Sequence, residues 1–144
     1  MEQAREQITI AAAPDHCLAV TVDFERYPEW AKDVREAKVT ERDTDGRGLR
    51  VEYRAAALGR STRYVLAYDF ADAPASFSWK LVEGDMLRRL DGRYRFSASG
   101  SGTRVTYELT AEPSIPIPGM LKRRAASRIV GTALKELKRE AEKG

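Results

Sequence analysis

Apolar and polar residues alternate along most of the chain up to Thr110, and this two-residue period predicts β-strands that each bury one face. Leu49, Val51 and Tyr53, for example, are separated by Arg50 and Glu52. Clusters of Asp, Gly, Pro and Ser lie between the alternating segments, so successive strands are expected to pair antiparallel. The opening strand is predicted at Gln7–Ala12, and the others at Lys38–Arg42, Leu49–Ala55, Arg63–Phe70, Ser76–Glu83, Leu90–Phe96 and Arg104–Thr110.

Two short segments after the opening strand, and one long segment at the end of the chain, have helical patterns. Pro14 suits the first helical position, and Asp15 complements the positive end of the helix dipole. From Pro118 onward apolar residues recur every four positions, whereas the opposite face is almost all Lys, Arg and Glu. The expected apolar stripe consists of Leu121, Ala125, Ile129, Ala133 and Leu137, flanked by Ala126, Val130, Leu134 and Ala141.

The long helix has to bury its apolar stripe, and the concave face of a curved sheet is the one large apolar surface that the pattern offers. We therefore predict an α+β helix-grip fold. A strongly curved antiparallel sheet of about seven strands surrounds the long C-terminal helix, with two short helices after the first strand. The sequence has no internal repeat and no linker-like stretch, so residues 1–144 are expected to form a single domain.

Composition narrows the class of protein. The chain has 144 residues, of which 42% are apolar and 33% charged, as in soluble globular proteins. No apolar run approaches the ~20 residues that a membrane span needs. Met1–Gln7 lacks the apolar core of a secretory signal, and Cys17 is the single cysteine. These features predict a cytoplasmic protein, and the high Ala and Arg content is typical of GC-rich bacterial genomes.

The small positive charge of +3 is concentrated in the last quarter of the chain. A basic helix is either a solvated face or a surface that contacts phosphates or membranes. Residues 120–144 contain no aromatic side chain, so nucleic acid is not expected as a partner. Transient contact with an anionic membrane stays open, and the sequence does not indicate an oligomeric state.

Reactive groups are sparse. His16 and Cys17 are the single residues of their types and lie side by side, which cannot build a tetrahedral metal site. No nucleophile motif is present, and the glycines form no phosphate-binding loop, so no metal, cofactor or catalytic residue is predicted. The predicted inward face also contains no clear carboxylate or histidine.

Large aromatic residues dominate that inward face, opposite an alanine-rich helix. The rings and the alanines either interdigitate in a filled core or leave an apolar cavity edged by tyrosine hydroxyls. For the second case, the expected ligand contacts include Met86, Met120 and Leu121 as gating residues beside a lid at Pro113–Gly119. The full candidate set is Trp30, Tyr53, Tyr64, Tyr68, Phe77, Trp79, Met86, Tyr94, Tyr107, Met120, Leu121 and Ala125.

The order of elements and three motifs resemble the START-like (SRPBCC) helix-grip superfamily, most closely its polyketide cyclase/dehydrase and coenzyme Q-binding branch. The motifs are Asp23–Trp30, Trp79–Asp85, and Leu90–Phe96 with Gly102–Tyr107. The resemblance covers nearly the whole chain. It implies that the protein binds or transports a hydrophobic small molecule, such as a lipid, quinone or polyketide, between sheet and helix. The alternatives are a polyketide cyclase or aromatase, and an interaction module that uses the basic helix.

Overall fold

The computed structural model describes residues 2–57 and 59–143, and its strands form one antiparallel sheet, as predicted. The sheet has seven strands in the order β1-β7-β6-β5-β4-β3-β2. Most strands extend beyond their predicted segments, because pairing continues where the apolar alternation becomes irregular. The bounds are β1 (Glu2–Ile10), β2 (Val34–Arg42), β3 (Gly48–Ala57), β4 (Arg60–Asp69), β5 (Ser76–Gly84), β6 (Leu87–Ser99) and β7 (Gly102–Pro113).

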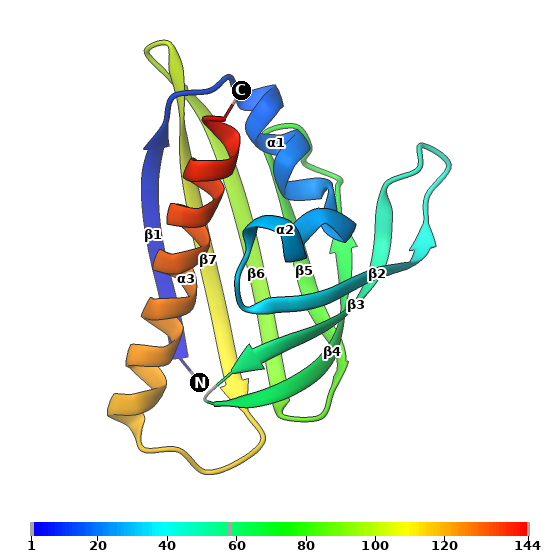
Figure 1. The fold of residues 1–144 in the computed structure, drawn as a ribbon, viewed down its shortest axis with the longest axis vertical. Helices are drawn as coiled ribbons and strands as arrows, with labels where there is room; N and C mark the ends of the chain where they lie inside the picture. Colours follow the sequence, from blue (N-terminus) through cyan, green and yellow to red (C-terminus); the bar gives the residue numbers. More distant parts are fainter. Residues whose placement is uncertain (1, 58, 144) are drawn as a thin grey trace.

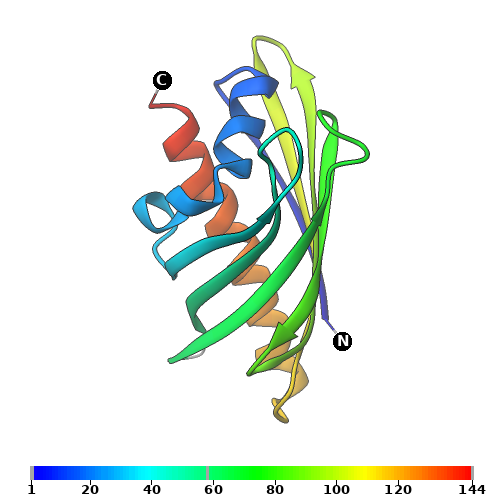
Figure 2. The same ribbon diagram turned by 90° about the vertical axis from the view of Figure 1, so that its right-hand side faces the viewer.

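The helices lie on the concave side of this sheet. Figure 1 shows α3 (Gly119–Ala141) across β1 and β7, with α1 (Pro14–Val22) near one end of the sheet. A 3-10 turn, η1 (Phe24–Arg26), leads into the single turn of α2 (Tyr27–Trp30), which lies between α3 and β2. Figure 2 shows the sheet from the side, with β2, β3 and β4 bending toward α3 and α2. The bent sheet and the helices therefore enclose a common interior, as the helix-grip prediction requires.

The buried face of α3 follows the flanking residues of the predicted stripe more closely than the stripe itself. The flanking Val130 and Leu134 are almost fully buried, as is Leu137 of the stripe, whereas the stripe residues Leu121 and Ile129 are exposed. A helix has 3.6 residues per turn, so positions four apart drift by about 40° per step, and four steps rotate the stripe by about 160°. The flanking positions follow the true helical period, and their side chains pack α3 against the sheet.

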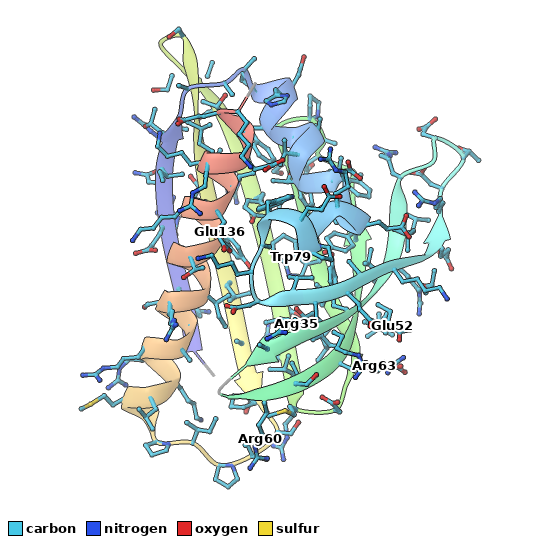
Figure 3. The ribbon with its side chains drawn as sticks, viewed as in Figure 1. Arg35, Glu52, Arg60, Arg63, Trp79 and Glu136 are labelled. Carbon is cyan, nitrogen blue, oxygen red and sulfur yellow. The ribbon has the colours of Figure 1, made fainter. Side chains whose placement is uncertain are left out.

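Charged residues occupy the convex face of the sheet. Arg63 on β4 bonds to Glu52 on β3 at 2.9 Å and to Glu83 on β5 at 3.0 Å (Figure 3). Cross-strand pairs of this kind align neighbouring strands while the other face stays apolar. Charged side chains therefore cover the outside of the sheet, and the aromatic rings face inward. The candidate site lies on that inward, concave side.

Candidate functional site

A cavity of about 220 Å³ lies between the concave face of the sheet, the α2–β2 segment and α3. An engineered cavity of about 150 Å³ accepts one benzene molecule, so this space can enclose roughly nine non-hydrogen atoms of a guest. All six tyrosines of the chain line it, together with both tryptophans. These aromatic residues are Tyr27, Trp30, Tyr53, Tyr64, Tyr68, Trp79, Tyr94 and Tyr107.

Strand register brings these rings together, because residues directly opposite each other on paired strands share one face of the sheet. Tyr53 pairs with Tyr64, and Tyr94 pairs with Tyr107, whose ring centroids are 4.6 Å apart. Trp79 has Tyr68 on one side and Gly92 on the other. The aromatic wall therefore follows from the two-residue alternation in five successive strands.

Gly92 makes room for the largest of these side chains. A Cβ atom at position 92 would lie 2.2 Å from Cζ2 of the Trp79 indole and 3.0 Å from the carbonyl oxygen of Glu108. Both distances are shorter than carbon contacts allow. The missing side chain of Gly92 is therefore what permits the indole to occupy this place in the cavity wall.

The tyrosine hydroxyls divide into two groups. Tyr53 and Tyr68 share a hydrogen bond of 2.6 Å, and Tyr27 donates to the backbone carbonyl of Thr21. Within the described residues, the hydroxyls of Tyr64, Tyr94 and Tyr107 have no hydrogen-bond partner, and no fully enclosed side-chain nitrogen or oxygen lacks one. Those three hydroxyls are therefore open to the cavity and can bond to a guest.

Burial raises the pKa of all six tyrosines, because a phenolate would lose its hydration in this apolar interior. Burial, followed by the nearby Asp33 carboxylate, raises the pKa of Tyr64 from 10.0 to about 12. The phenols therefore keep their protons at neutral pH. They can donate hydrogen bonds to a carbonyl or hydroxyl oxygen of a guest, and they cannot act as bases there.

Two carboxylates also line the cavity, which corrects the expectation that the inward face contains none. Asp33 is exposed in the turn just before β2, whereas Glu136 on α3 is only 7% exposed. Glu136 Oε2 accepts a hydrogen bond of 3.1 Å from the backbone N–H of Lys32. Glu136 follows Ile129 and Ala133 at helical spacing, so a 3.6-residue period in place of the four-residue stripe would have found it.

The structure brings most of the sequence-predicted candidates together. Seven of them line the cavity: Trp30, Tyr53, Tyr64, Tyr68, Trp79, Tyr94 and Tyr107. Phe77 lies behind this wall, fully buried, with its ring centroid 6.0 Å from that of Trp79.

The remaining four candidates do not line the cavity: Met86, Met120, Leu121 and Ala125. Met120 and Leu121 are 60% and 49% exposed, because the first turn of α3 extends beyond the sheet. Several residues outside the sequence-predicted set also line the cavity. They include Tyr27, Asp33, Thr62, Ile129, Thr132, Ala133 and Glu136.

Other site types are not indicated within the described part of the chain. No group of three or more His, Cys, Asp or Glu residues there could hold a metal ion. No helix of the described residues is long and apolar enough to cross a membrane.

Solved structures with the same fold come from several organisms. A START superfamily protein from Mycobacterium smegmatis superposes with a TM-score of 0.92 at 22% identity, over 98% of this chain and 97% of that one. A protein from Thermus thermophilus gives 0.86 at 27% identity, over 99% and 98% of the two chains. An aromatase/cyclase from a Streptomyces species gives 0.80 at 14% identity, over 99% and 94%.

Sequence comparison gives the family. No functionally curated protein is significantly similar to the chain. The sequence profile described as "polyketide cyclase / dehydrase and lipid transport" matches residues 1–142. With the curved sheet, the long C-terminal helix and the superposed START-superfamily structure, this match confirms the predicted START-like relationship. The chain belongs to the polyketide cyclase/dehydrase and lipid transport family.

Proposed function

We propose that the protein binds a hydrophobic small molecule, of the lipid, quinone or polyketide type, in the cavity, and that it carries or senses this molecule. The observation that supports the proposal is the combination of an aromatic wall with three phenol hydroxyls that have no partner in the described protein. Apolar walls with a few convergent polar groups are typical of small-molecule sites. The family description, which includes lipid transport, agrees with this use of the cavity.

A polyketide cyclase or aromatase is the second candidate, because one solved structure of this fold is an aromatase/cyclase. Such a reaction needs a group that removes a proton from the substrate. The raised pKa values of the tyrosines make them donors at neutral pH, so Glu136 and Asp33 are the cavity-lining groups left for that step. Binding requires no such step, and for this reason we place binding first.

Native mass spectrometry of freshly purified protein, followed by organic extraction, tests the binding proposal. A retained quinone, lipid or polycyclic compound would support it and would give the ligand class. Trp79→Ala and Tyr68→Ala should weaken the uptake of apolar dyes, whereas Arg50→Ala, on the exposed face, should not. An empty protein that takes up no dye, or equal affinities in all three variants, would contradict the proposal.

We also propose that one end of the molecule makes transient contact with an anionic membrane during loading or release. Three of the exposed large apolar side chains, Ile115, Met120 and Leu121, lie in the loop before α3 and in its first turn. Residues 113–135 contain no Asp or Glu and five basic residues, Lys122, Arg123, Arg124, Arg128 and Lys135. None of these five forms an ion pair with a described residue.

Apolar side chains beside unpaired basic ones match the interface of an anionic bilayer. Vesicle co-sedimentation with zwitterionic lipid, and with the same lipid plus an anionic one, tests this contact. Binding should require the anionic lipid, weaken with salt, and weaken in a Met120→Asp, Leu121→Asp variant. Val82→Asp, at an exposed apolar residue of β5, is the matched control. Indifference to lipid charge would contradict the proposal.

A further inference from the structure

Glu136 is a charged side chain in an apolar setting. It is 7% exposed, it lines the cavity, and it lies on α3 beside the buried Leu137. Figure 3 shows it on the side of α3 nearest α2, with Trp79 on the sheet beyond α2. Burying a carboxylate is costly unless a cation or several hydrogen bonds compensate it.

The protein itself compensates this charge only in part. Glu136 Oε2 accepts one hydrogen bond, from the backbone N–H of Lys32 at 3.1 Å. Within residues 2–57 and 59–143, Glu136 forms no ion pair, and its Oε1 atom accepts no hydrogen bond. No fully enclosed side-chain oxygen in that part of the chain lacks a partner, so Oε1 has access to open space. Because Glu136 lines the cavity, we take this space to be part of the cavity in which ligand binding is proposed.

The hydrogen bond from the backbone N–H of Lys32 also holds the Glu136 carboxylate in place. Lys32 lies between α2 and β2, in the segment whose neighbours Trp30, Ala31 and Asp33 line the cavity. The carboxylate therefore has one oxygen held by the protein and one oxygen presented to a guest. Such an oxygen accepts hydrogen bonds and repels other anions.

We propose that Glu136 holds the polar end of the ligand, and that this end is a hydrogen-bond donor, a protonated amine or a hydroxyl, and not a carboxylate. This inference rests on the function proposed above, because it assigns the ligand of the same cavity. A donor at this position would complete the hydrogen bonding of Glu136. The three open tyrosine hydroxyls would contact oxygens elsewhere on the guest.

Three matched benzene compounds test the inference, because each has about eight or nine non-hydrogen atoms and the cavity encloses roughly nine. They are benzylamine, benzyl alcohol and benzoate, measured by isothermal titration calorimetry. We expect the amine and the alcohol to bind about ten- to a hundredfold more tightly than the carboxylate, the range of a charge-assisted hydrogen bond.

Glu136→Gln is the decisive variant, because its side-chain carbonyl can still accept from Lys32 N–H. It should reduce the preference for amine over carboxylate at least tenfold. Glu136→Met keeps a similar length without charge and should show the same loss. Glu140→Gln removes an equal charge one turn further along α3, at a residue that does not line the cavity, and should leave the preference unchanged.

The outcomes separate the two proposals. Equal binding of all three compounds, or an unchanged preference in both Glu136 variants, would overturn this inference and leave the cavity as a binding site. Uptake of apolar dyes without uptake of any of the three benzene compounds would also count against the inference. If neither dyes nor benzene compounds bind, the proposed function itself fails.

Discussion

Replacing Gly92 by alanine should force the Trp79 indole out of its place in the cavity wall. The new Cβ atom would lie 2.2 Å from Cζ2 and 2.5 Å from Cε2 of the indole, where carbon atoms need about 3.5–4.0 Å. Moving the backbone instead is obstructed, because the same Cβ would lie 3.0 Å from the carbonyl oxygen of Glu108 on β7. The rings of Tyr94 and Tyr107 both have centroids 5.6 Å from that of Trp79, so the open cavity is the direction left for the indole.

Overpacking of this kind costs about 1–3 kcal/mol of unfolding free energy. For a domain near this size each kcal/mol lowers the melting temperature by about 2–4 °C. Urea unfolding followed by far-ultraviolet circular dichroism measures the first quantity, and a dye titration measures the accompanying loss of cavity. Gly119→Ala is the matched control, because a Cβ there would meet only Arg123 Nη1 at 3.6 Å. It should be neutral or slightly stabilising.

A second change separates this mechanism from a general intolerance of Gly92 to substitution. Trp79→Leu removes the ring that the new methyl group would meet, so the double variant should be more stable than the sum of the single costs predicts. The coupling should be about 1–2 kcal/mol, within the range for contacting residues. Additive costs, or a Gly92→Ala protein with unchanged stability and dye uptake, would refute the packing argument.

Three further predictions concern the polar groups of the fold. The folded-state pKa of Tyr64 is raised to about 12, so the stability from keeping it protonated is complete below pH 10.0 and is lost as the pH rises toward 12. Tyrosinate absorbance should therefore stay low in the folded protein and rise on alkaline unfolding; free titration of all tyrosines near their ordinary pKa would contradict the burial. Tyr53→Phe should cost about 1–3 kcal/mol of unfolding free energy in urea, because it leaves the Tyr68 hydroxyl without its 2.6 Å partner, and a double Phe variant should cost less than two single changes. Hydrogen bonds from arginine lower the pKa values of Glu52 and Glu108, so these carboxylates stabilise the fold above their unfolded pKa of 4.5, and this contribution is lost as the pH falls through their folded pKa values. Glu52→Gln and Glu108→Gln should each flatten the acid side of the stability profile, and an unchanged profile in both would exclude these ion pairs as its cause.

The sheet could be predicted from the sequence because its signal is local. Tyr53, Tyr64, Trp79, Tyr94 and Tyr107 all occupy inward positions of alternating segments, and antiparallel neighbours keep that alternation in register. Their convergence on one cavity needed no long-range information beyond the curvature of the sheet. For this reason the rings that the strands contribute to the cavity were all among the predicted residues, whereas Tyr27 on α2 was not, and the predicted Phe77 lies behind the wall.

The helical part of the site was harder to predict, because it depends on rotation about one axis. The four-residue stripe included Leu121 and Ala125, which do not line the cavity, as well as Ile129 and Ala133, which do. It did not include Glu136, which also lines the cavity. Whether a gap stays open opposite the aromatic wall depends on the distance between α3 and the sheet, which no local pattern records. The hydrogen bond between the Lys32 backbone N–H and Glu136 could not be predicted from a local pattern either, because the two residues lie 104 positions apart in the sequence.

The interior of this protein is not arranged for stability alone. A larger apolar side chain at Ala133 would fill part of the cavity, and an apolar side chain at Glu136 would remove the cost of burying a charge. Both changes are short steps in sequence, and both would be expected to stabilise an empty core. Retaining a small residue and a carboxylate opposite three open phenol hydroxyls makes physical sense when a guest completes the packing and the hydrogen bonding. The cavity, the hydroxyls and Glu136 are then parts of one site, and its ligand contributes the contacts that the folded chain leaves unmade.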